Sequence, residues 1–410
     1  MSAPPDQLDM TTVPQPVLDK SPARTRRLAN LPTYVFAWLD ELKAAARARG
    51  ASLIDLGMGN PDIPTPPSVI EAIADAYRDP ATHRYPPFPG TERFRTAVAR
   101  FMEDRFGVDV DPAREVLCVS GAKEAIAQVT MGYVDEGGAA LVPDIYYPVH
   151  ARATGLVGGT VHPLPLREER GFLPDFDAVP AAQLRNARIL ILNYPHNPTG
   201  AVATLDFWEE AVAFCRRHGI VLVSDLAYSE LTFDGFTAPS VLEVPGARDV
   251  AIELHSFSKT FSMAGSRIGW AVGNAEIVDV LHAVRTNTGY GTPAAIQAGA
   301  AYALDHHREL VAPTVARYRE RRDAIVEGFR SLGWTCAPPR ATMFVWLPVP
   351  AGFTAQQWTE HLIDTAQVVV TPGNAFGPGG EGFFRVSLVA EPATLRQAID
   401  RLKAAGVRYG

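Results

Sequence analysis

Short apolar runs alternate with amphipathic stretches through the middle of the chain. Each run holds three or four residues and is partly β-branched. Apolar and polar positions do not alternate within it, which is typical of strands buried on both faces of a parallel sheet. This arrangement predicts an α/β layered domain over about 60–290. The predicted strands lie at 116–119, 140–142, 189–192, 220–223 and 250–252, and the predicted helices between them at 123–133, 147–155 and 205–218.

From about residue 300 the pattern changes to that of a smaller α+β unit. A long helical stretch comes first, three separate strand candidates follow, and a helix closes the chain. These elements are expected at 310–332, 343–346, 368–370, 384–386 and 392–405. We therefore expect a large domain over 61–294 and a smaller one built from 28–60 and 295–410.

The N-terminal region has two parts. Residues 1–27 are rich in Pro, Asp and Thr and end in a basic stretch, which predicts a loosely ordered arm. The basic end is either a solvated tail or a strap that docks a partner. A helix is expected over 34–49, where Phe36, Leu39 and Leu42 recur at three-residue steps.

Composition narrows the class of protein. The 410 residues include 47% hydrophobic residues, which is ample for a core, and the formal net charge of -7 gives no general attraction to nucleic acid or anionic membranes. Three cysteines without a CxxC pair predict neither a disulfide framework nor a zinc site, and no metal is expected. No long apolar run and no secretory signal is visible, so we expect a cytoplasmic enzyme.

The segment from Ser256 to Gly269 follows a predicted strand and combines hydroxyl side chains with Lys259 and Arg267. Ligands bind at the carboxyl ends of strands in α/β sheets, and hydroxyl groups with an Arg suit a phosphate. A Lys in such a place can form a Schiff base if its amine is partly deprotonated. The alternative interpretation is a solvated turn rich in Ser and Lys.

Asp225 ends another apolar run, and Tyr228 follows three residues later. A carboxylate at the end of a buried strand is costly unless it is paired, and a pyridinium nitrogen is one suitable partner. Tyr228 would then reach an oxygen on the same ring. The alternative is that Ser224 or Asp225 caps a helix.

Two further segments carry candidate ligand-binding groups. The stretch from Asn193 to Gly200 contains two prolines, which suit it to hold Asn197 rigidly, although it is also an ordinary tight-turn sequence. His196 within it is expected to be a loop histidine rather than a catalyst. Arg385 lies inside an apolar strand and would bind a carboxylate through its planar guanidinium, or else form a buried structural ion pair.

The order of these segments is more specific than any one of them. It runs Asn-Pro-Thr-Gly, Asp-x-x-Tyr, Ser-x-Ser-Lys with an Arg eight residues after the Lys, and a late Arg in a strand. This order resembles the class I/II aminotransferases, pyridoxal-phosphate enzymes of fold type I, from about Leu28 to the C-terminus. The phrases NLPTYVFAWLDELKAAARARG, DLGMGNPDIPTPP and APSVLEVPGARDVAIELHSFSK are similar to the bacterial alanine (glutamate–pyruvate) aminotransferase branch, which is close to the LL-diaminopimelate aminotransferases.

The resemblance implies a large domain with a mostly parallel seven-stranded sheet sandwiched by helices. It also implies that Lys259 carries pyridoxal 5'-phosphate as an internal aldimine, that Asp225 pairs with the pyridine nitrogen, and that Arg385 binds the substrate α-carboxylate. The other implied positions are Tyr228 and Asn197 at the ring 3-oxygen, Tyr147 on the ring face, Ser256, Ser258, Arg267 and the Ala122–Lys123 turn at the phosphate, Gly59, Asn197 and Tyr34 at the substrate, and Tyr85 at the phosphate of a neighbouring subunit.

The implied activity is ping-pong transfer of an amino group between an L-amino acid and a 2-oxo acid. Alanine or glutamate with pyruvate or 2-oxoglutarate is the expected pair. LL-diaminopimelate or another specialised amino acid is the alternative, as is elimination, decarboxylation or an oxidase-like reaction with the same cofactor. The segment 286–291 carries no cation for a second substrate carboxylate. Tyr85 implies a homodimer with shared sites. A dehydrogenase is excluded because no GxGxxG follows an early strand.

Overall fold

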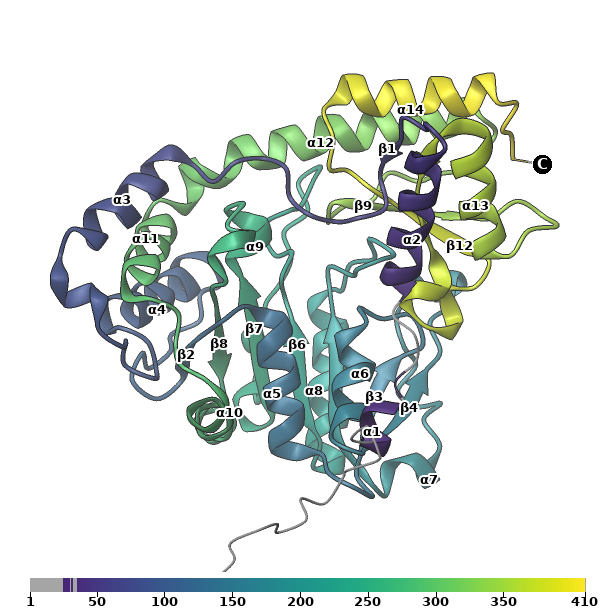
Figure 1. The fold of residues 1–410 in the computed structure, drawn as a ribbon. Helices are drawn as coiled ribbons and strands as arrows, with labels where there is room; N and C mark the ends of the chain where they lie inside the picture. Colours follow the sequence, from purple (N-terminus) through teal and green to yellow (C-terminus); the bar gives the residue numbers. More distant parts are fainter. Residues whose placement is uncertain (1–24, 30, 32–34, 410) are drawn as a thin grey trace, which may run out of the picture.

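The computed structural model describes residues 25–29, 31 and 35–409. Most of the predicted arm over 1–27, and the candidate Tyr34, lie outside the described residues. In the described part, seven strands form one sheet in the order β2-β8-β7-β6-β5-β3-β4 (Figure 1). Neighbouring strands are parallel except around β8, which is antiparallel to both β2 and β7. The strands are β2 (Val116–Val119), β3 (Ala139–Pro143), β4 (Thr160–Leu164), β5 (Ala187–Asn193), β6 (Val221–Asp225), β7 (Ala251–Ser256) and β8 (Gly269–Gly273).

All five runs predicted as buried strands belong to this sheet, whereas β4 and β8 were not predicted. β4 lies at the sheet edge, and two of its five residues are exposed and two only partly buried, so it has no continuous apolar run. β8 begins and ends with glycine, which leaves only three apolar residues between them. A Cβ on Gly269 would come within 2.4 Å of the His255 carbonyl oxygen, so close strand pairing requires glycine there.

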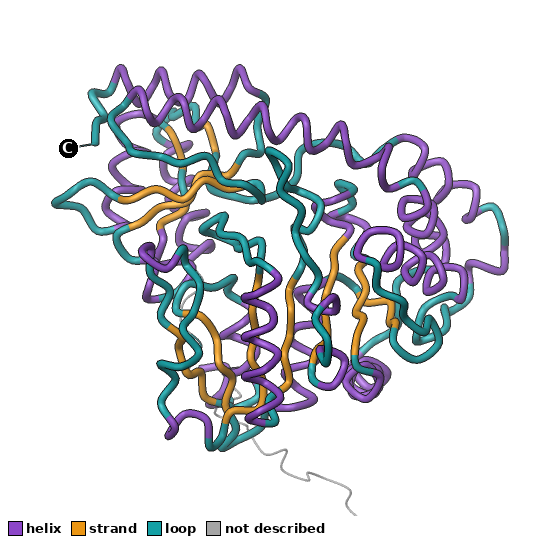
Figure 2. The backbone as a smooth tube through the Cα atoms, turned by 180° about the vertical axis from the view of Figure 1, so that it is seen from behind, coloured by secondary structure: helices purple, strands orange, loops and turns teal. Residues whose placement is uncertain are grey.

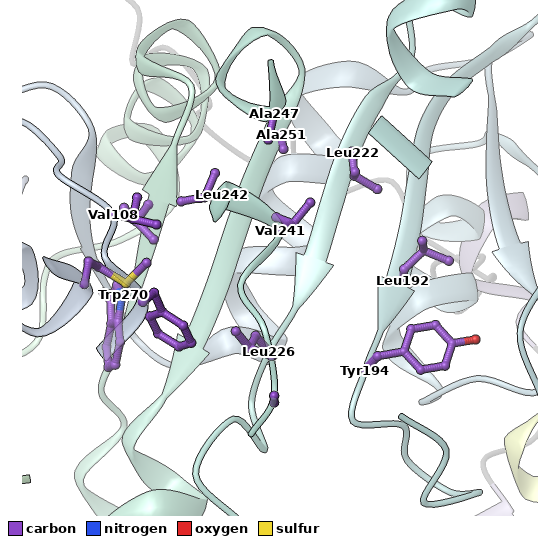
Figure 3. Close-up of a cluster of buried hydrophobic side chains, with 14 of the residues drawn as sticks. Val108, Leu192, Tyr194, Leu222, Leu226, Val241, Leu242, Ala247, Ala251 and Trp270 are labelled. Carbon is purple, nitrogen blue, oxygen red and sulfur yellow. The ribbon is translucent and has the colours of Figure 1, made fainter. Parts of the chain in front are cut away.

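Side chains along the strands alternate between two apolar layers. In β5, Leu190 and Leu192 join the layer that contains α8 (Leu205–His218), while Ile189 and Ile191 face α5 (Ala122–Tyr133). Figure 3 shows part of the first layer, including Leu192, Leu222 and Trp270. The helices α5, α6 (Val149–Leu156) and α10 (Ala275–Thr288) cover one face and α8 the other, as the views from front and back show (Figures 1 and 2). Burial on both faces explains the non-alternating apolar runs.

A second unit lies beside the carboxyl ends of the sheet strands (Figure 1). It has its own apolar core, in which Phe329, Trp334 and Phe384 are buried. Its strands form the pairs β1-β10 and the order β11-β12-β9. Its elements are α2 (Val35–Ala48), β1 (Ile54–Asp55), α12 (His307–Ser331), β9 (Phe344–Pro348), α13 (Ala355–Ala366), β10 (Val368–Val369), β11 (Thr371–Pro372), β12 (Phe383–Ser387) and α14 (Pro392–Ala404). The predicted C-terminal strands and helices are thus present, each within a few residues of its expected limits.

The structure places two segments differently from the expected domain division. α1 (Arg26–Ala29) contacts α6, and Arg27 forms an ion pair with Glu136 at 2.9 Å, on the large-sheet side. α11 (Ala294–Asp305) packs on α3 (Pro67–Tyr77) and α4 (Glu92–Phe106) and contributes to the apolar layer shared with α8. The long α12 then runs across both units (Figure 1). We therefore propose the same two domains with the C-terminal boundary moved into α12.

The remaining described elements are short. They are α7 (Ala181–Leu184), α9 (Phe257–Thr260) and the 3-10 turns η1 (Pro80–His83), η2 (Glu168–Arg170), η3 (Val241–Glu243), η4 (Ala247–Asp249), η5 (Ala264–Ser266), η6 (Gly373–Phe376) and η7 (Pro378–Gly380). Among the described helices, none is both long enough and apolar enough to cross a membrane.

Candidate active site

Three neighbouring strands end at one cavity of about 260 Å³. β5 ends at Asn193, β6 at Asp225 and β7 at Ser256, and Asn193 pairs with Asp225 in the sheet register. The second unit closes the cavity from the other side with residues of β9 and β12. The structure brings together here, among the predicted site residues, Gly59, Ala122, Lys123, Tyr147, Asn197, Asp225, Tyr228, Ser256, Ser258, Lys259, Arg267 and Arg385.

Asp225 is buried with one carboxylate oxygen paired and the other not. Its Oδ2 lies 3.1 Å from His150 Nε2, whereas Oδ1 has no hydrogen-bond partner among the described residues. No helix follows directly after β6, so the alternative of a helix cap is wrong. A buried carboxylate oxygen without a donor is unfavourable for the protein alone, and it is suited to a ligand that brings an N–H group.

Lys259 lies on α9, directly after β7, and its Nζ donates a hydrogen bond to the Gly59 carbonyl oxygen at 2.9 Å. Burial, together with the positive charges of Arg385 and Arg267, lowers the pKa of Lys259 to about 8. Roughly a tenth of its amine is therefore uncharged at pH 7, and the uncharged form is the one that attacks a carbonyl. The solvated-turn interpretation is wrong, because this Lys lines the cavity and is not exposed.

The N-terminus of α5 and Arg267 form one polar wall of the cavity. Gly121 precedes the helix with φ of 99°, and a Cβ there would lie 2.8 Å from Arg267 Nη2. Arg267 donates hydrogen bonds to the carbonyl oxygens of Ser120 and Ala264 at 3.1 and 3.0 Å. Free backbone N–H groups at a helix N-terminus next to a guanidinium make a natural anion site. Ser256 and Ser258 also line the cavity.

Arg385 enters from β12 and is 3% exposed. It donates hydrogen bonds from Nη1 to Asn197 Oδ1 at 2.9 Å and from Nη2 to the Gly57 carbonyl oxygen at 2.7 Å. Asn197 is held in turn, because its backbone N–H donates to Asn193 Oδ1 at 2.9 Å. These hydrogen bonds fit the prediction that Asn197 is held in place.

The other predicted residues occupy different places. The Tyr228 ring packs edge-on against Phe344 with centroids 5.7 Å apart, and burial raises the pKa of its hydroxyl. Tyr147 lies two residues before α6, which begins later than the predicted helix over 147–155. His196 does not line the cavity; burial lowers its pKa to about 3, so it is neutral. Tyr85 is 77% exposed and lies away from this cavity.

Sequence reasoning missed several residues of the site. His150, the partner of Asp225, lies 75 positions earlier and no local pattern marks it. Phe344 lines the cavity but belongs to an apolar strand whose other residues form core. The sequence marks Asn193 only as the start of a turn. Its side chain accepts from the Asn197 N–H and donates to the Asp225 carbonyl oxygen at 2.7 Å. The position of Asn193 at the end of a predicted strand is the one feature of the sequence that indicated a role for it.

Comparison with known proteins places the chain in a family. Residues 51–402 match the aminotransferase class I and II family. The chain belongs to the class I and II aminotransferases. LL-diaminopimelate aminotransferase 2 of Trichormus variabilis is 45% identical over 94% of this aminotransferase and 99% of that protein. LL-diaminopimelate aminotransferase of Moorella thermoacetica is 45% identical over 92% of this chain and 97% of that protein.

Solved structures agree with this assignment. BacF from Bacillus subtilis superimposes with a TM-score of 0.91 at 35% identity, covering 95% of this aminotransferase and all of that chain. A probable N-succinyldiaminopimelate aminotransferase from Thermus thermophilus superimposes with a TM-score of 0.86 at 36% identity, covering 90% of this chain and 100% of that chain. The fold type I expectation and the mostly parallel sheet are confirmed.

The cofactor of this aminotransferase is pyridoxal 5'-phosphate. The residues present fit it. The unpartnered Asp225 Oδ1 is suited to a protonated ring nitrogen, and the wall of Gly121 and Arg267 is suited to a phosphate. The largely buried Lys259, whose amine has a lowered pKa, lines the same cavity.

Proposed function

We propose that this aminotransferase moves the amino group of LL-diaminopimelate to a 2-oxo acid, with Lys259, Asp225 and Arg385 as its central residues. One observation carries the reaction type: a Lys of lowered pKa, a buried carboxylate with an open oxygen and a buried Arg meet in one cavity. These are the groups needed to hold a pyridine ring, to move a proton and to orient an α-carboxylate.

The substrate proposal rests on the relatives. Eight proteins named LL-diaminopimelate aminotransferase are 41–46% identical to this chain over at least 92% of its length. The sequence analysis favoured alanine or glutamate and kept LL-diaminopimelate as the alternative. The names of these relatives support the alternative better than the first choice.

The chain's own residues orient the substrate and move its proton. Arg385, fixed by Asn197 and Gly57, would bind the α-carboxylate and thereby hold the Cα–H bond toward Lys259. The Lys259 amine would take the Cα proton as general base and later return it. When bound, pyridoxal phosphate supplies the electron sink that makes this proton acidic. Asp225 would keep the ring nitrogen protonated, because a nearby carboxylate favours the charged form.

We also propose a homodimer with shared sites. Tyr85 is 77% exposed and stacks on Tyr290 with ring centroids 4.3 Å apart, and Tyr290 stacks on Phe88 at 5.5 Å. Exposed aromatic rings of this kind are typical of protein interfaces. In the dimer Tyr85 would reach the phosphate of the partner site. A light-scattering mass of 44.3 kDa, the monomer value, would contradict this proposal.

The test of the substrate is a comparison of single amino donors. LL-diaminopimelate, alanine and glutamate are each added to the protein loaded with pyridoxal phosphate, and loss of the cofactor's visible absorbance is followed. We expect a kcat/KM about a hundredfold higher for LL-diaminopimelate than for the other two, with absorbance restored by 2-oxoglutarate or pyruvate. Faster reaction with alanine or glutamate would contradict the substrate proposal. Restoration without any 2-oxo acid would contradict the reaction type.

A further inference from the structure

The guanidinium of Arg385 contacts two phenyl rings. Its Cζ lies 4.1 Å from the ring centroid of Phe344 and 4.5 Å from that of Phe376. Both phenylalanines are buried, at 1% and 0% exposure. A cation this close to aromatic faces in a dry environment is held by an interaction stronger than at an exposed site.

Phe344 is fixed by its neighbours on three sides. It begins β9 and pairs with Ser387 in the register with β12, the strand that carries Arg385. A Cβ on Gly59 would lie 2.7 Å from its ring, so the turn that accepts the Lys259 hydrogen bond packs directly on it. The ring also meets Tyr228 edge-on. Phe344 therefore cannot turn without displacing other parts of the cavity wall.

Phe376 is held by contacts from both units of the fold. Its ring packs edge-on against Phe36 and Trp346, with centroids 6.1 and 6.0 Å apart. Its carbonyl oxygen accepts a hydrogen bond from the Tyr146 N–H at 2.6 Å, and Tyr146 directly precedes Tyr147. The packing of Phe376 on Arg385 therefore depends on the segment after β3, which also carries Tyr147 of the cavity lining.

We propose that Phe344 and Phe376 are positioning residues that set the plane of the Arg385 guanidinium for the substrate α-carboxylate. This rests on the proposed function of Arg385. Two parallel N–H···O bonds to a carboxylate require a guanidinium plane held within roughly 10–20°. Hydrogen bonds to Asn197 and Gly57 fix its edge, and the two rings restrict rotation of its plane.

The test is a double-mutant cycle with Phe376→Leu and Arg385→Lys. The half-reaction with LL-diaminopimelate is followed in all four proteins. With Arg385 present, we expect Phe376→Leu to lower kcat/KM about tenfold, mostly through KM, because carboxylate binding is weakened. A lysine ammonium has no plane to be set. In the Arg385→Lys background the same substitution should therefore change kcat/KM less than about twofold.

Phe383→Leu is the matched control. Phe383 lies on β12 two residues before Arg385 and stacks on Trp346 with centroids 5.3 Å apart. The control should change kcat/KM less than about twofold and lower the thermal midpoint less than Phe376→Leu, because Phe383 is only partly buried. If Phe376→Leu does not fold, Phe344→Leu takes its place in the same cycle.

The outcomes separate the two levels of the proposal. If Phe376→Leu does not lower kcat/KM with Arg385 present, or lowers it equally in both backgrounds, the rings do not position Arg385. Arg385 would then remain the proposed carboxylate-binding residue. An unchanged KM in Arg385→Lys and in Arg385→Ala would instead overturn carboxylate binding by Arg385, and with it the proposed function of Arg385.

Discussion

Two buried carboxylates on adjacent strands have opposite surroundings. Glu253 on β7 is 0% exposed, and four groups surround it at 2.7–3.2 Å: the hydroxyls of Ser224 and Ser240, the N–H of Val241 and the ring of His255. Asp225 on β6 has His150 at one oxygen and no described partner at the other. Ser224 pairs with Glu253 in the sheet register, so the carboxylates point to opposite faces of the sheet.

The difference separates a carboxylate that stabilises the fold from one prepared for a ligand. Both are costly to bury, and Glu253 recovers the cost through its donors. Asp225 leaves part of its hydrogen-bonding capacity open toward the cavity, which is expected at a functional site. Isosteric amide substitutions therefore should affect different properties at the two positions.

The largest expected effect is on activity, from Asp225→Asn. An amide cannot keep the ring nitrogen protonated, so we expect kcat/KM to fall by about a thousandfold, in the range seen when a single electrostatic contact in an active site is removed. The apo protein should keep its unfolding free energy within about 1 kcal/mol, since the open oxygen has no donor to lose. Steady-state kinetics and urea unfolding test the two parts. Unchanged kcat/KM would remove Asp225 from the mechanism.

The second effect is on stability, from Glu253→Gln. The amide places a donor among groups that donate to the carboxylate, so we expect the unfolding free energy to fall by about 2 kcal/mol. Activity of the folded enzyme should change less than about threefold. Urea unfolding beside the Asp225→Asn protein gives the comparison directly. A catalytic loss as large as that of Asp225→Asn would show that the two carboxylates do not differ in the way proposed.

A smaller effect is expected at the partner of Asp225. His150→Asn removes the ring that orients Oδ2, so kcat/KM should fall about tenfold. The matched control is His162→Asn, because His162 contacts Asn186 at 3.0 Å far from the cavity lining. Equal kinetics for the two variants would argue that Asp225 needs no orienting partner.

The smallest effect concerns pH and Lys259. Its pKa is lowered to about 8 in the folded protein from 10.5 in the unfolded chain, so above pH 8 the unfolded state binds more protons. Stability of the apo protein should therefore rise with pH, by about 1 kcal/mol between about pH 7 and about pH 9 from this group. Lys259→Met should lack this rise. Urea unfolding at both pH values of the two apo proteins tests it, and parallel curves would contradict the lowered pKa.

The sequence predicted local helices and strands well. Site residues that lie far apart in the chain were grouped only by the order of their motifs. The helix over Leu205–His218 was predicted with the observed limits, because Thr204 caps its start and Gly219, with φ of 62°, ends it. Lys259, Asp225 and Arg385 were found from strand ends and motif order. The contacts of Phe376 with Arg385 and of His150 with Asp225 depend on how the two units and their loops pack, which no local spacing encodes.

The protonation state of the cofactor's ring nitrogen reports directly on the role of Asp225. The protein is loaded with pyridoxal phosphate labelled with ¹⁵N in the ring, and the nitrogen chemical shift is measured near neutral pH in the wild type, Asp225→Asn and Glu253→Gln. We expect a protonated nitrogen in the wild type and Glu253→Gln, and an unprotonated one in Asp225→Asn. The same signal in all three proteins would contradict this role of Asp225.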